Sequence, residues 1–369
     1  MIYTEQTMSF PAKRENNKKR SYLVVNPLQG KHVPVSPTAA FDMFGALADI
    51  LKQAYREEKL LLIGFAETAT AVGAYIAGEL NALYMQTTRE SVKNGDFFYF
   101  SEQHSHATEQ KLVKSDLNQA VGQVTRIIFI EDEITTGRTI LNIIQLLREA
   151  YPGKLRYSAA SLLNGMTAEH ERIYEDQKIC LHFLVKTDHS EYEKRVSGYK
   201  GDGVYHSCKL LPQLLELPEY RPSGYQDARR LVRGIAYKEA CQRMCLETVD
   251  MSETKNSRNI LVLGTEECMY PALCLASYFE KSGKQVKCHS TTRSPIAVSM
   301  ESTYPLHERY ELISFYDDNR RTFLYDLVLY DEVWIVTDAK AGKKGLSSLV
   351  CALQSKGNDK IRLVRWCSY

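Results

Sequence analysis

The sequence predicts an α/β protein with a mostly parallel sheet flanked by helices, followed by a second, smaller α/β domain of Rossmann-like type. Three observations carry this prediction. Short β-branched and aromatic runs alternate with amphipathic helical segments, which is the pattern of parallel sheets. The run Ile127–Ile130 has no polar residue, as expected of a strand buried on both faces. A new strand–helix–strand series begins at Asn259, after a polar linker.

The composition narrows the functional classes. The chain has 369 residues, of which 44% are hydrophobic and 25% are charged, as is usual for a soluble globular protein of two domains. A net charge of +2 gives no reason to expect a nucleic acid or a membrane as a partner. The nine cysteines show no spacing typical of a disulfide framework or a zinc site, so we expect a reducing, cytoplasmic location.

The first sixty residues contain basic candidates and the first regular elements. Residues 1–20 are polar and basic and are predicted to form a mobile arm. A strand at 21–25 is followed by a loop with proline and glycine that carries the basic pair Lys31 and His32. Ser36 and Pro37 then supply the N-cap and first position of a helix.

The next strand, Leu60–Phe65, leads into a turn of small residues and a helix at 72–80. Small side chains let the backbone approach a ligand closely, and a helix N-terminus favours an anion. The phosphate-binding candidates in this turn are Ala66, Glu67, Thr68, Ala69 and Thr70. A close strand–helix crossing without a ligand is the alternative. A third strand, at 84–90, carries Arg89 near its end.

A polar tract with two histidines follows the aromatic residues at 97–100. His104 and His106 are spaced like metal ligands, but no third ligand lies nearby in the sequence, so zinc is not expected. Lys111 closes this tract. The tract is interpreted either as a loop that closes over a site or as a solvated loop with incidental histidines.

The segment at 125–141 holds the most specific motif. The strand Ile127–Ile130 ends in the carboxylates Glu131 and Asp132, and a threonine- and glycine-rich turn then feeds a helix at 140–150. The turn consists of Thr135, Thr136, Gly137, Arg138 and Thr139. Backbone N–H groups at a helix N-terminus and threonine hydroxyls hold phosphate, while paired carboxylates bind adjacent hydroxyls or help to hold Mg²⁺. This combination predicts a ribose 5-phosphate site.

In its order and spacing, this segment resembles the phosphoribosyl-pyrophosphate (PRPP) loop of type I phosphoribosyltransferases. Glu133 is a departure, because the family usually has an apolar residue after the acid pair. The resemblance implies that Glu131 and Asp132 hold the ribose hydroxyls and that Mg²⁺ is bound at Asp132 through PRPP. It further implies pyrophosphate contacts from 66–70, Arg89 and Lys111, catalytic support from His104 and His106, and an acceptor hood at Lys31 and His32.

The second domain shows a resemblance of its own. The tract Thr291–Pro295 resembles the signature of the TRSP domain, which accompanies a phosphoribosyltransferase in bacterial proteins associated with tellurite-resistance and stress operons. We therefore expect the following order: a basic arm at 1–20, a phosphoribosyltransferase domain with its hood at 21–215, a helical linker at 216–257, and the TRSP α/β domain at 258–369.

A separate ligand site is predicted in this second domain, where two neighbouring strands end. Its candidates are Gly264, Thr265, Glu266, Thr291, Thr292, Arg293 and Ser294. The Arg293 guanidinium suits phosphate or carboxylate, and the glutamates at 266 and 267 could pair with it or contact a sugar. The alternative is a strand-to-turn cap in which Ser294 and Pro295 start a helix.

Together these resemblances imply a PRPP-dependent phosphoribosyltransferase that joins ribose 5-phosphate to a nitrogen acceptor with release of pyrophosphate. Mg²⁺ is the expected cofactor, and a nucleotide-like biosynthetic or stress-response pathway is the expected setting. A non-catalytic regulatory or scaffold protein that binds PRPP or a nucleotide is the alternative. The expected partners are PRPP and a base-like acceptor, with a homodimer and other proteins of the same pathway as further candidates.

Overall fold

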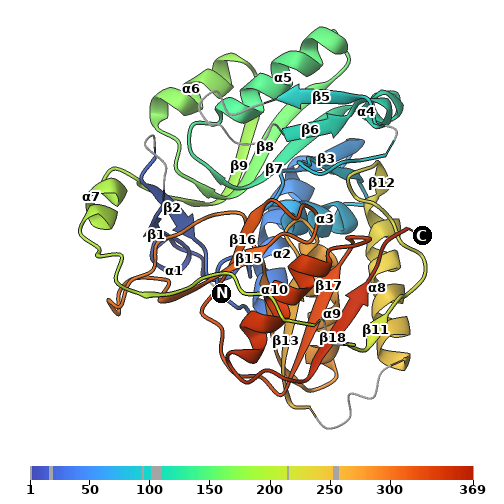
Figure 1. Ribbon diagram of the computed structural model, residues 1–369. Helices are drawn as coiled ribbons and strands as arrows, with labels where there is room; N and C mark the ends of the chain where they lie inside the picture. Colours follow the sequence, from blue (N-terminus) through green and yellow to red (C-terminus); the bar gives the residue numbers. More distant parts are fainter. Residues whose placement is uncertain are drawn as a thin grey trace. The chain divides into compact units, whose positions relative to one another are not determined.

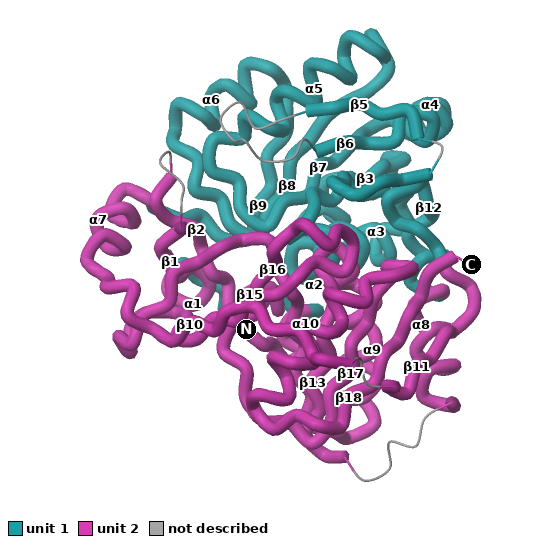
Figure 2. Tube along the Cα trace, viewed as in Figure 1, with its two compact units in different colours: residues 1–5, 41–188, 226–239 teal, residues 6–40, 189–225, 240–369 magenta. Residues whose placement is uncertain are grey.

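The computed structural model describes residues 2–15, 20–93, 95–100, 110–213, 216–251 and 257–368. The chain divides into two compact units, each built from separate stretches of sequence (Figure 2). Unit 1 comprises residues 1–5, 41–188 and 226–239, and unit 2 comprises residues 6–40, 189–225 and 240–369. The predicted domain bounds differ from this division mainly because residues 6–40 and 189–225 cluster with the C-terminal part of the chain.

Unit 1 is organised around a six-stranded sheet (Figure 1). Its strand order is β12-β4-β3-β7-β8-β9, and every neighbouring pair is parallel except β12 with β4. The strands are β3 (Leu60–Gly64), β4 (Leu83–Gln86), β7 (Arg126–Ile134), β8 (Arg156–Asn164), β9 (Cys180–Lys186) and β12 (Val232–Arg233). This confirms the predicted parallel α/β class.

Helices cover both faces of this sheet, which explains why its central strands are apolar throughout. The four residues of Ile127–Ile130 have no exposed surface. On one side lie α5 (Arg138–Ala150) and α6 (Ala168–Asp176), and on the other lies α3 (Thr70–Glu79) (Figure 1). Helix α5 buries an apolar stripe at helical spacing, made of Ile140, Ile143, Ile144 and Leu147.

A hairpin and two helices also belong to unit 1, wholly or in part. An antiparallel hairpin of β5 (Phe97–Phe100) and β6 (Gln110–Val113) is followed by α4 (Lys114–Val121). Most of α2 (Pro37–Ala54) also belongs to this unit, from Phe41 onward.

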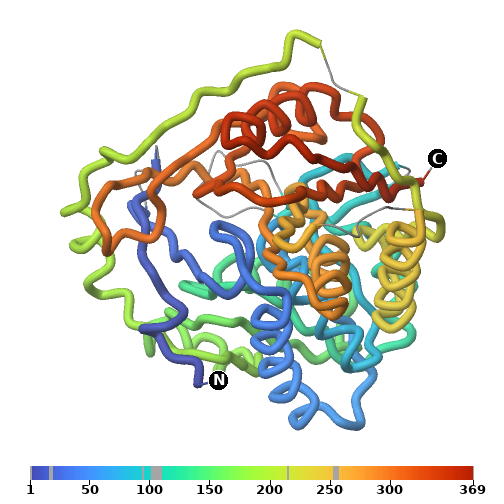
Figure 3. Tube along the Cα trace, turned by 90° about the horizontal axis from the view of Figure 1, so that it is seen from below, coloured from blue at the N-terminus to red at the C-terminus, as the bar shows by residue number. Residues whose placement is uncertain are grey.

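Unit 2 contains a five-stranded, fully parallel sheet in the order β11-β18-β17-β13-β14. These strands are β11 (Glu219–Tyr220), β13 (Asn259–Gly264), β14 (Gln285–Ser290), β17 (Glu332–Thr337) and β18 (Ile361–Arg365). Helices α9 (Met269–Lys281, orange) and α10 (Lys343–Gln354, red) lie on opposite sides of it (Figure 3). This is the doubly wound arrangement expected when right-handed crossovers run in two directions from the first strand.

Two smaller sheets also belong to unit 2. One joins β10 (Val204–His206), β15 (Glu308–Ile313) and β16 (Arg321–Tyr325), and the other is the antiparallel pair of β1 (Phe10–Lys13) and β2 (Tyr22–Val25). The remaining helices are α1 (Glu5–Met8), α7 (Tyr192–Ser197) and α8 (Gly234–Asp250).

The expectation of a mobile N-terminal arm does not hold for residues 5–13, because they form α1 and β1. Ala12 of β1 and Val25 of β2 are buried in one apolar cluster with Ile296, Phe323 and Tyr325. Burying this apolar surface outweighs the basic character of the segment. None of the helices in the described parts of the chain has the length and apolar character needed to cross a membrane.

Candidate functional site

The predicted phosphate turn lies between β7 and α5 in unit 1. Gly137 is the N-cap of α5 and has a φ of +67°, the left-handed region that favours glycine. Tyr174 of α6 is buried and donates a hydrogen bond from its hydroxyl to the Gly137 carbonyl over 2.8 Å. A Cβ atom at position 137 would lie 2.3 Å from the Tyr174 hydroxyl oxygen. Both the backbone angle and the close packing therefore require glycine here.

The acid pair belongs to the strand itself, which differs from the prediction. The strand was expected to end at Ile130, but β7 continues to Ile134. The reason is that its two neighbours have different lengths: pairing with β3 stops at Gly64 opposite Ile130, whereas pairing with β8 continues to Asn164 opposite Ile134. Glu131 and Asp132 thus extend beyond β3 at the carboxyl edge of the sheet, where open α/β sheets bind ligands.

One hydrogen bond joins the two loops predicted to bind PRPP. The Thr68 hydroxyl, from the loop after β3, donates to Oδ1 of Asp132 over 2.7 Å. Burial, together with the nearby Glu133 carboxylate, raises the pKa of Asp132 to about 6, against the opposing effect of this hydrogen bond. Asp132 is therefore a carboxylate held in a fixed position and easily protonated in mildly acidic solution.

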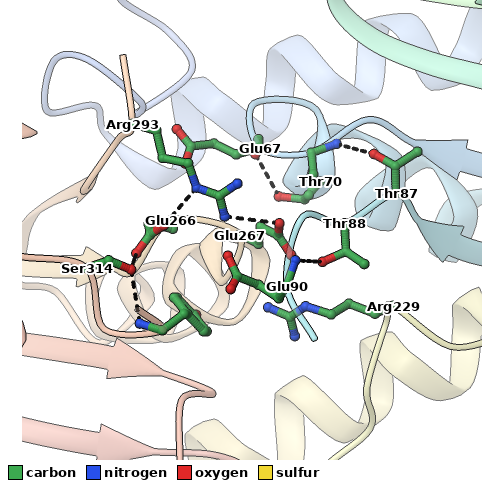
Figure 4. A network of polar contacts seen from close by, with 12 residues as sticks. Glu67, Thr70, Thr87, Thr88, Glu90, Arg229, Glu266, Glu267, Arg293 and Ser314 are labelled. Carbon is green, nitrogen blue, oxygen red and sulfur yellow. Dashed lines mark hydrogen bonds and ion pairs between the residues drawn. The ribbon is translucent and has the colours of Figure 1, made fainter. Parts of the chain in front are cut away.

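The loop at 65–70 is held by backbone and hydroxyl contacts on both sides. The N–H of Phe65 donates to the Ile130 carbonyl over 3.0 Å, and the N–H of Ala66 donates to the Thr87 hydroxyl over 2.8 Å. The Thr70 hydroxyl donates to the Glu67 carbonyl over 3.2 Å, as Figure 4 shows. The Ala66–Glu67 peptide bond is cis, and α3 begins at Thr70. These contacts place the whole loop at the N-terminus of a helix.

Arg89 and Lys111 lie on neighbouring backbone segments. Thr88 and Lys111 exchange two backbone hydrogen bonds of 3.0 Å, so Arg89 follows directly on the residue paired with Lys111. The Lys111 ammonium lies 4.9 Å from the centre of the Phe97 ring, a cation–π contact. Figure 4 shows the Thr88 hydroxyl accepting from the N–H of Glu90 over 2.9 Å. The pyrophosphate roles of Arg89 and Lys111 remain predictions.

The other predicted site residues of the phosphoribosyltransferase resemblance lie elsewhere. His104 and His106 lie outside the described residues. Lys31 and His32 are buried in unit 2, where the Lys31 ammonium donates to the carbonyls of Glu266 over 3.2 Å and Thr291 over 3.1 Å. This contact gives Lys31 a structural role within unit 2, and a hood role for the pair remains a prediction.

In unit 2, the predicted second-domain residues form a buried ion-pair network (Figure 4). The Arg293 guanidinium bonds Oε2 of Glu266 through Nε at 2.8 Å and Oε1 of Glu267 through Nη2 at 3.2 Å. The Ser314 hydroxyl donates to the other Glu266 oxygen over 2.5 Å. Arg320 adds a second cation, 3.1 Å from Glu266. The pairing of Arg293 with the glutamates, one of the two predicted alternatives, is therefore the one observed.

The remaining members of the predicted set hold this network in place. Gly264 ends β13, and the Thr291 hydroxyl accepts from the N–H of Glu266 over 3.0 Å. The Thr265 hydroxyl bonds the Thr337 hydroxyl over 2.8 Å. The Thr292 hydroxyl accepts from the N–H of Ser294 over 3.2 Å. Ligand binding by these residues stays a prediction.

Comparison with known families also divides the chain into two parts, at bounds that differ from those of the two compact units. Residues 9–188 match the PRTase_2 family, described as a phosphoribosyl transferase, and residues 235–353 match the family described as the TRSP domain C-terminal to PRTase_2. The chain joins a phosphoribosyltransferase domain to a TRSP domain. No curated protein matches it in sequence.

Several solved adenine phosphoribosyltransferases resemble the phosphoribosyltransferase domain. The enzyme from Rhodothermus marinus is 14% identical with a TM-score of 0.36, and the match covers 50% of this chain and 96% of that one. The enzyme from Leishmania tarentolae is 16% identical with a TM-score of 0.36, covering 51% and 88%. A Trypanosoma brucei enzyme solved with AMP, pyrophosphate and ribose-5-phosphate is 16% identical with a TM-score of 0.36, covering 49% and 77%.

The sequence did not reveal some of the residues that support the two candidate sites. Tyr174 supports the turn at 135–139 from 37 residues away, and no local pattern marks it. In the TRSP domain, Ser314 and Arg320 bind Glu266 from the turn between β15 and β16. The available signal was a glutamate directly after an apolar strand, because a charge placed where it can be buried requires a partner.

The phosphoribosyltransferase domain offers Mg²⁺ few protein ligands. Among the described residues, no group of three His, Cys, Asp or Glu side chains could hold a metal ion. Glu131 and Asp132 are the carboxylates at the loop, and one oxygen of Asp132 already accepts from Thr68. This donor set fits an ion that takes most of its ligands from substrate oxygens and water, as Mg²⁺ commonly does.

The raised pKa of Asp132 predicts a pH-dependent stability. Because the folded-state pKa of about 6 lies above the usual aspartate value, the contribution of Asp132 to stability is fully present below about pH 4 and is lost as the pH rises through about 6. Asp132→Asn should therefore stabilise the protein more at pH 8 than at pH 4.5. Urea unfolding of both proteins at the two pH values measures this, and a difference that does not vary with pH would contradict it.

Proposed function

We propose that this chain is a PRPP-dependent phosphoribosyltransferase that transfers ribose 5-phosphate to a nitrogen acceptor. The bond between ribose C1 and the pyrophosphate oxygen breaks, a C1–N bond forms, pyrophosphate leaves, and the acceptor nitrogen loses a proton. The observation that carries the proposal is the 2.7 Å hydrogen bond from Thr68 to Asp132, which places the loop at 65–70 beside the acid pair. The two loops can then act on one PRPP molecule.

Each part of the site has a role in this reaction. The turn at 135–139, with its glycine cap and its position at the N-terminus of α5, would hold the 5-phosphate through backbone N–H groups and hydroxyls. Glu131 and Asp132 would accept hydrogen bonds from the ribose hydroxyls. The loop at 66–70 and Arg89 would face the pyrophosphate. Mg²⁺, held at Asp132 mainly through the substrate, would supply positive charge to the leaving group.

The rate enhancement would come mainly from positioning and electrostatics. In a loose transition state, positive charge develops on the ribose and negative charge on pyrophosphate, so fixed carboxylates and nearby donors matter more than a strong base. Asp132 suits this role because Thr68 and the surrounding protein fix its position before substrate binds. A base-like acceptor, a nucleotide-related pathway and a cytoplasmic location are part of the proposal.

Loss of the carboxylate at 132 tests the proposal. Asp132→Asn should weaken binding of Mg²⁺–PRPP by about 1–3 kcal/mol, because hydrogen bonds to a charged group are lost. Calorimetry measures the affinity, and pyrophosphate release with a panel of nucleobases measures turnover. Asp176→Asn, the same substitution at an exposed position on α6, is the matched control and should leave both unchanged.

Two outcomes would change the assignment. Unchanged PRPP affinity in Asp132→Asn would overturn the placement of the site. Normal PRPP binding by the unmodified protein without pyrophosphate release, across all acceptors, would favour the regulatory or scaffold alternative. Mass spectrometry of cell extract incubated with the protein and PRPP would then identify any acceptor absent from the panel.

A further inference from the structure

The strand topology of unit 2 repeats that of unit 1. Four parallel strands lie in the order β4-β3-β7-β8 in unit 1 and β14-β13-β17-β18 in unit 2. Helices α3 and α9 follow the first strand of each set in sequence, and α5 and α10 follow the third. In both units an antiparallel hairpin, β5–β6 or β15–β16, is inserted between the second and third strands. The same fold plan therefore occurs twice in the chain.

The strand register repeats as well. Gly64 at the end of β3 pairs with Gln86 and Ile130, and Gly264 at the end of β13 pairs with Ser290 and Val336. The backbone hydrogen bonds beyond these glycines also correspond. The N–H of Phe65 donates to the Ile130 carbonyl over 3.0 Å, and the N–H of Thr265 donates to the Val336 carbonyl over 3.2 Å in the same way. The N–H of Thr87 donates to the Gly64 carbonyl over 2.9 Å, and its counterpart Thr291 donates to the Gly264 carbonyl over 3.0 Å.

A three-residue sequence occupies the same position in both units. Thr-Thr-Arg follows β4 at 87–89 and follows β14 at 291–293. The second threonine of each pairs by two backbone hydrogen bonds with the second strand of the inserted hairpin, at Lys111 in unit 1 and at Phe323 in unit 2. Arg293 of the TRSP signature is thus the topological equivalent of Arg89.

This equivalence assigns a counterpart to the 5-phosphate turn. In unit 2 the corresponding turn joins β17 to α10. Its glycine, Gly342, is the N-cap of α10 with a φ of +92°, as Gly137 is the N-cap of α5 with a φ of +67°. The carbonyl of each glycine accepts the first hydrogen bond of its helix. The donor to Gly342 is the N–H of Leu346 at 2.8 Å, and the donor to Gly137 is the N–H of Leu141 at 3.0 Å.

The turn between β17 and α10 borders a cavity of about 660 Å³. This volume lies within the usual range for sites that bind small molecules. Four basic side chains line it, Arg221, Lys340, Lys343 and Arg365, against two acidic ones, Glu219 and Asp318. Neither lysine forms an ion pair with a carboxylate in the part of the chain that the structure describes. The cavity therefore has an excess of positive charge.

Arg365 is the buried member of this set, with 7% of its side chain exposed. Its Nη1 donates to the carbonyls of Ala339 over 2.5 Å and Ala341 over 2.7 Å, and its Nε lies 3.2 Å from Glu219. No hydrogen bond to a described residue engages Nη2. A guanidinium fixed on two sides in this way keeps one donor group for a ligand of the cavity that it lines.

We propose that the turn between β17 and α10 of unit 2 is a second anion site that binds a phosphate monoester. Lys340 and Lys343 would supply ammonium groups where the turn of unit 1 supplies threonine hydroxyls. The N-terminus of α10 would add backbone donors and the favourable end of the helix dipole. Arg365 would supply a charge-assisted hydrogen bond from within the cavity wall.

The same comparison indicates binding without transfer. Where unit 1 has Glu131 and Asp132, unit 2 has Thr337 and Asp338, and Oδ1 of Asp338 accepts from the Tyr316 hydroxyl over 2.5 Å. The counterpart of the pyrophosphate loop contains Glu266, which is fully buried among cations. The two arginines beside this loop are thus already paired with Glu266 and offer little positive charge to a diphosphate. The unit 2 site is therefore suited to a phosphorylated sugar or nucleotide and not to PRPP.

Site-resolved hydrogen exchange of the full chain tests this. Ribose 5-phosphate, AMP or inorganic phosphate should protect the backbone at 340–346, and adenosine, which lacks phosphate, should not. Lys340→Ala combined with Lys343→Ala should remove this protection and weaken calorimetric binding at this site by about tenfold or more, since two charged donors are lost. Protection at 135–141 reports the unit 1 site separately, so the two proposals can fail independently.

Lys344→Ala is the matched control. Lys344 follows Lys343 on the same helix turn but pairs with Asp318 over 3.3 Å and does not line the cavity. The Lys344→Ala variant should keep full protection of the backbone at 340–346 by the phosphate-containing ligands. Absence of protection there with every phosphate ester at saturation would overturn the proposal, and so would an equal loss in the control variant. Binding of phosphate but not of either ester would restrict the site to the inorganic ion and would also overturn it.

Discussion

Arg293→Ala should lower the free energy of unfolding of unit 2 by about 3–5 kcal/mol, because the substitution removes a cation that pairs with two buried carboxylates. Arg293 is 10% exposed, and Glu266 and Glu267 have no exposed side-chain surface. Arg320 remains beside Glu266, so the loss is partly compensated there. Urea unfolding followed by hydrogen exchange in β13 and β14 measures the change within unit 2.

An exposed pair of the same type serves as the control. Arg321 lies 3.4 Å from Glu311 with 73% of its side chain exposed, and Arg321→Ala should cost less than about 1 kcal/mol. Arg293→Lys should fall between the two, because it keeps the charge but loses the planar donor pair. If Arg293→Ala costs no more than Arg321→Ala, the network contributes little to stability and Arg293 is available for a ligand.

Gly137→Ala should reduce pyrophosphate release by about 100-fold, because a displacement of roughly 1 Å at a substrate-positioning turn has an effect of that size. The new Cβ would lie 2.3 Å from the Tyr174 hydroxyl oxygen, and Tyr174 is only 1% exposed, so its ring has little room to move aside. The turn between β7 and α5 must shift instead. Steady-state kinetics and ribose 5-phosphate affinity measure the result.

Gly153 of unit 1 offers a matched control for the backbone angle. Its φ is +69°, but a Cβ there meets nothing within 4 Å. Gly153→Ala should therefore cost only the conformational penalty of about 1–2 kcal/mol in stability, with turnover unchanged. Equal activity in the two variants would show that the packing of Tyr174 against the turn does not position the substrate.

The parts of the fold that were predicted correctly are those with local signals. The buried run Ile127–Ile130 and the turn at 135–139 are each continuous in sequence. The hydrophobic pattern and the motif were therefore sufficient to predict a buried strand followed by a turn. The extension of β7 to Ile134 was missed because it depends on β8 being longer than β3, which no local pattern reveals. The packing of Tyr174 on Gly137 was missed for the same reason, because a contact between residues 37 positions apart produces no local sequence pattern.

Charge was informative in one case and misleading in another. The sequence allowed the pairing of Glu266 with Arg293 to be predicted, because the ends of two neighbouring strands bring such groups together at one edge of a sheet. The basic residues of the N-terminal segment suggested a solvated arm, yet β1 supplies Ala12 to an apolar cluster of unit 2. Lys31, a basic residue of an irregular loop, is likewise fully buried, with two backbone carbonyls as partners. In such segments, long-range packing decides the structure.

The discontinuous make-up of unit 2 affects how this protein can form during its synthesis. Val35 exchanges backbone hydrogen bonds with Cys288, so the two partners are about 250 residues apart. At ordinary ribosomal speeds, roughly 10–50 s separate their emergence, and the segment at Val35 must wait that long for its partner strand. Unit 1 needs nothing beyond residue 239 and can be complete before then. A fragment that starts at Arg258 would lack Val35 and would leave the edge of β14 at Cys288 open to pairing between chains.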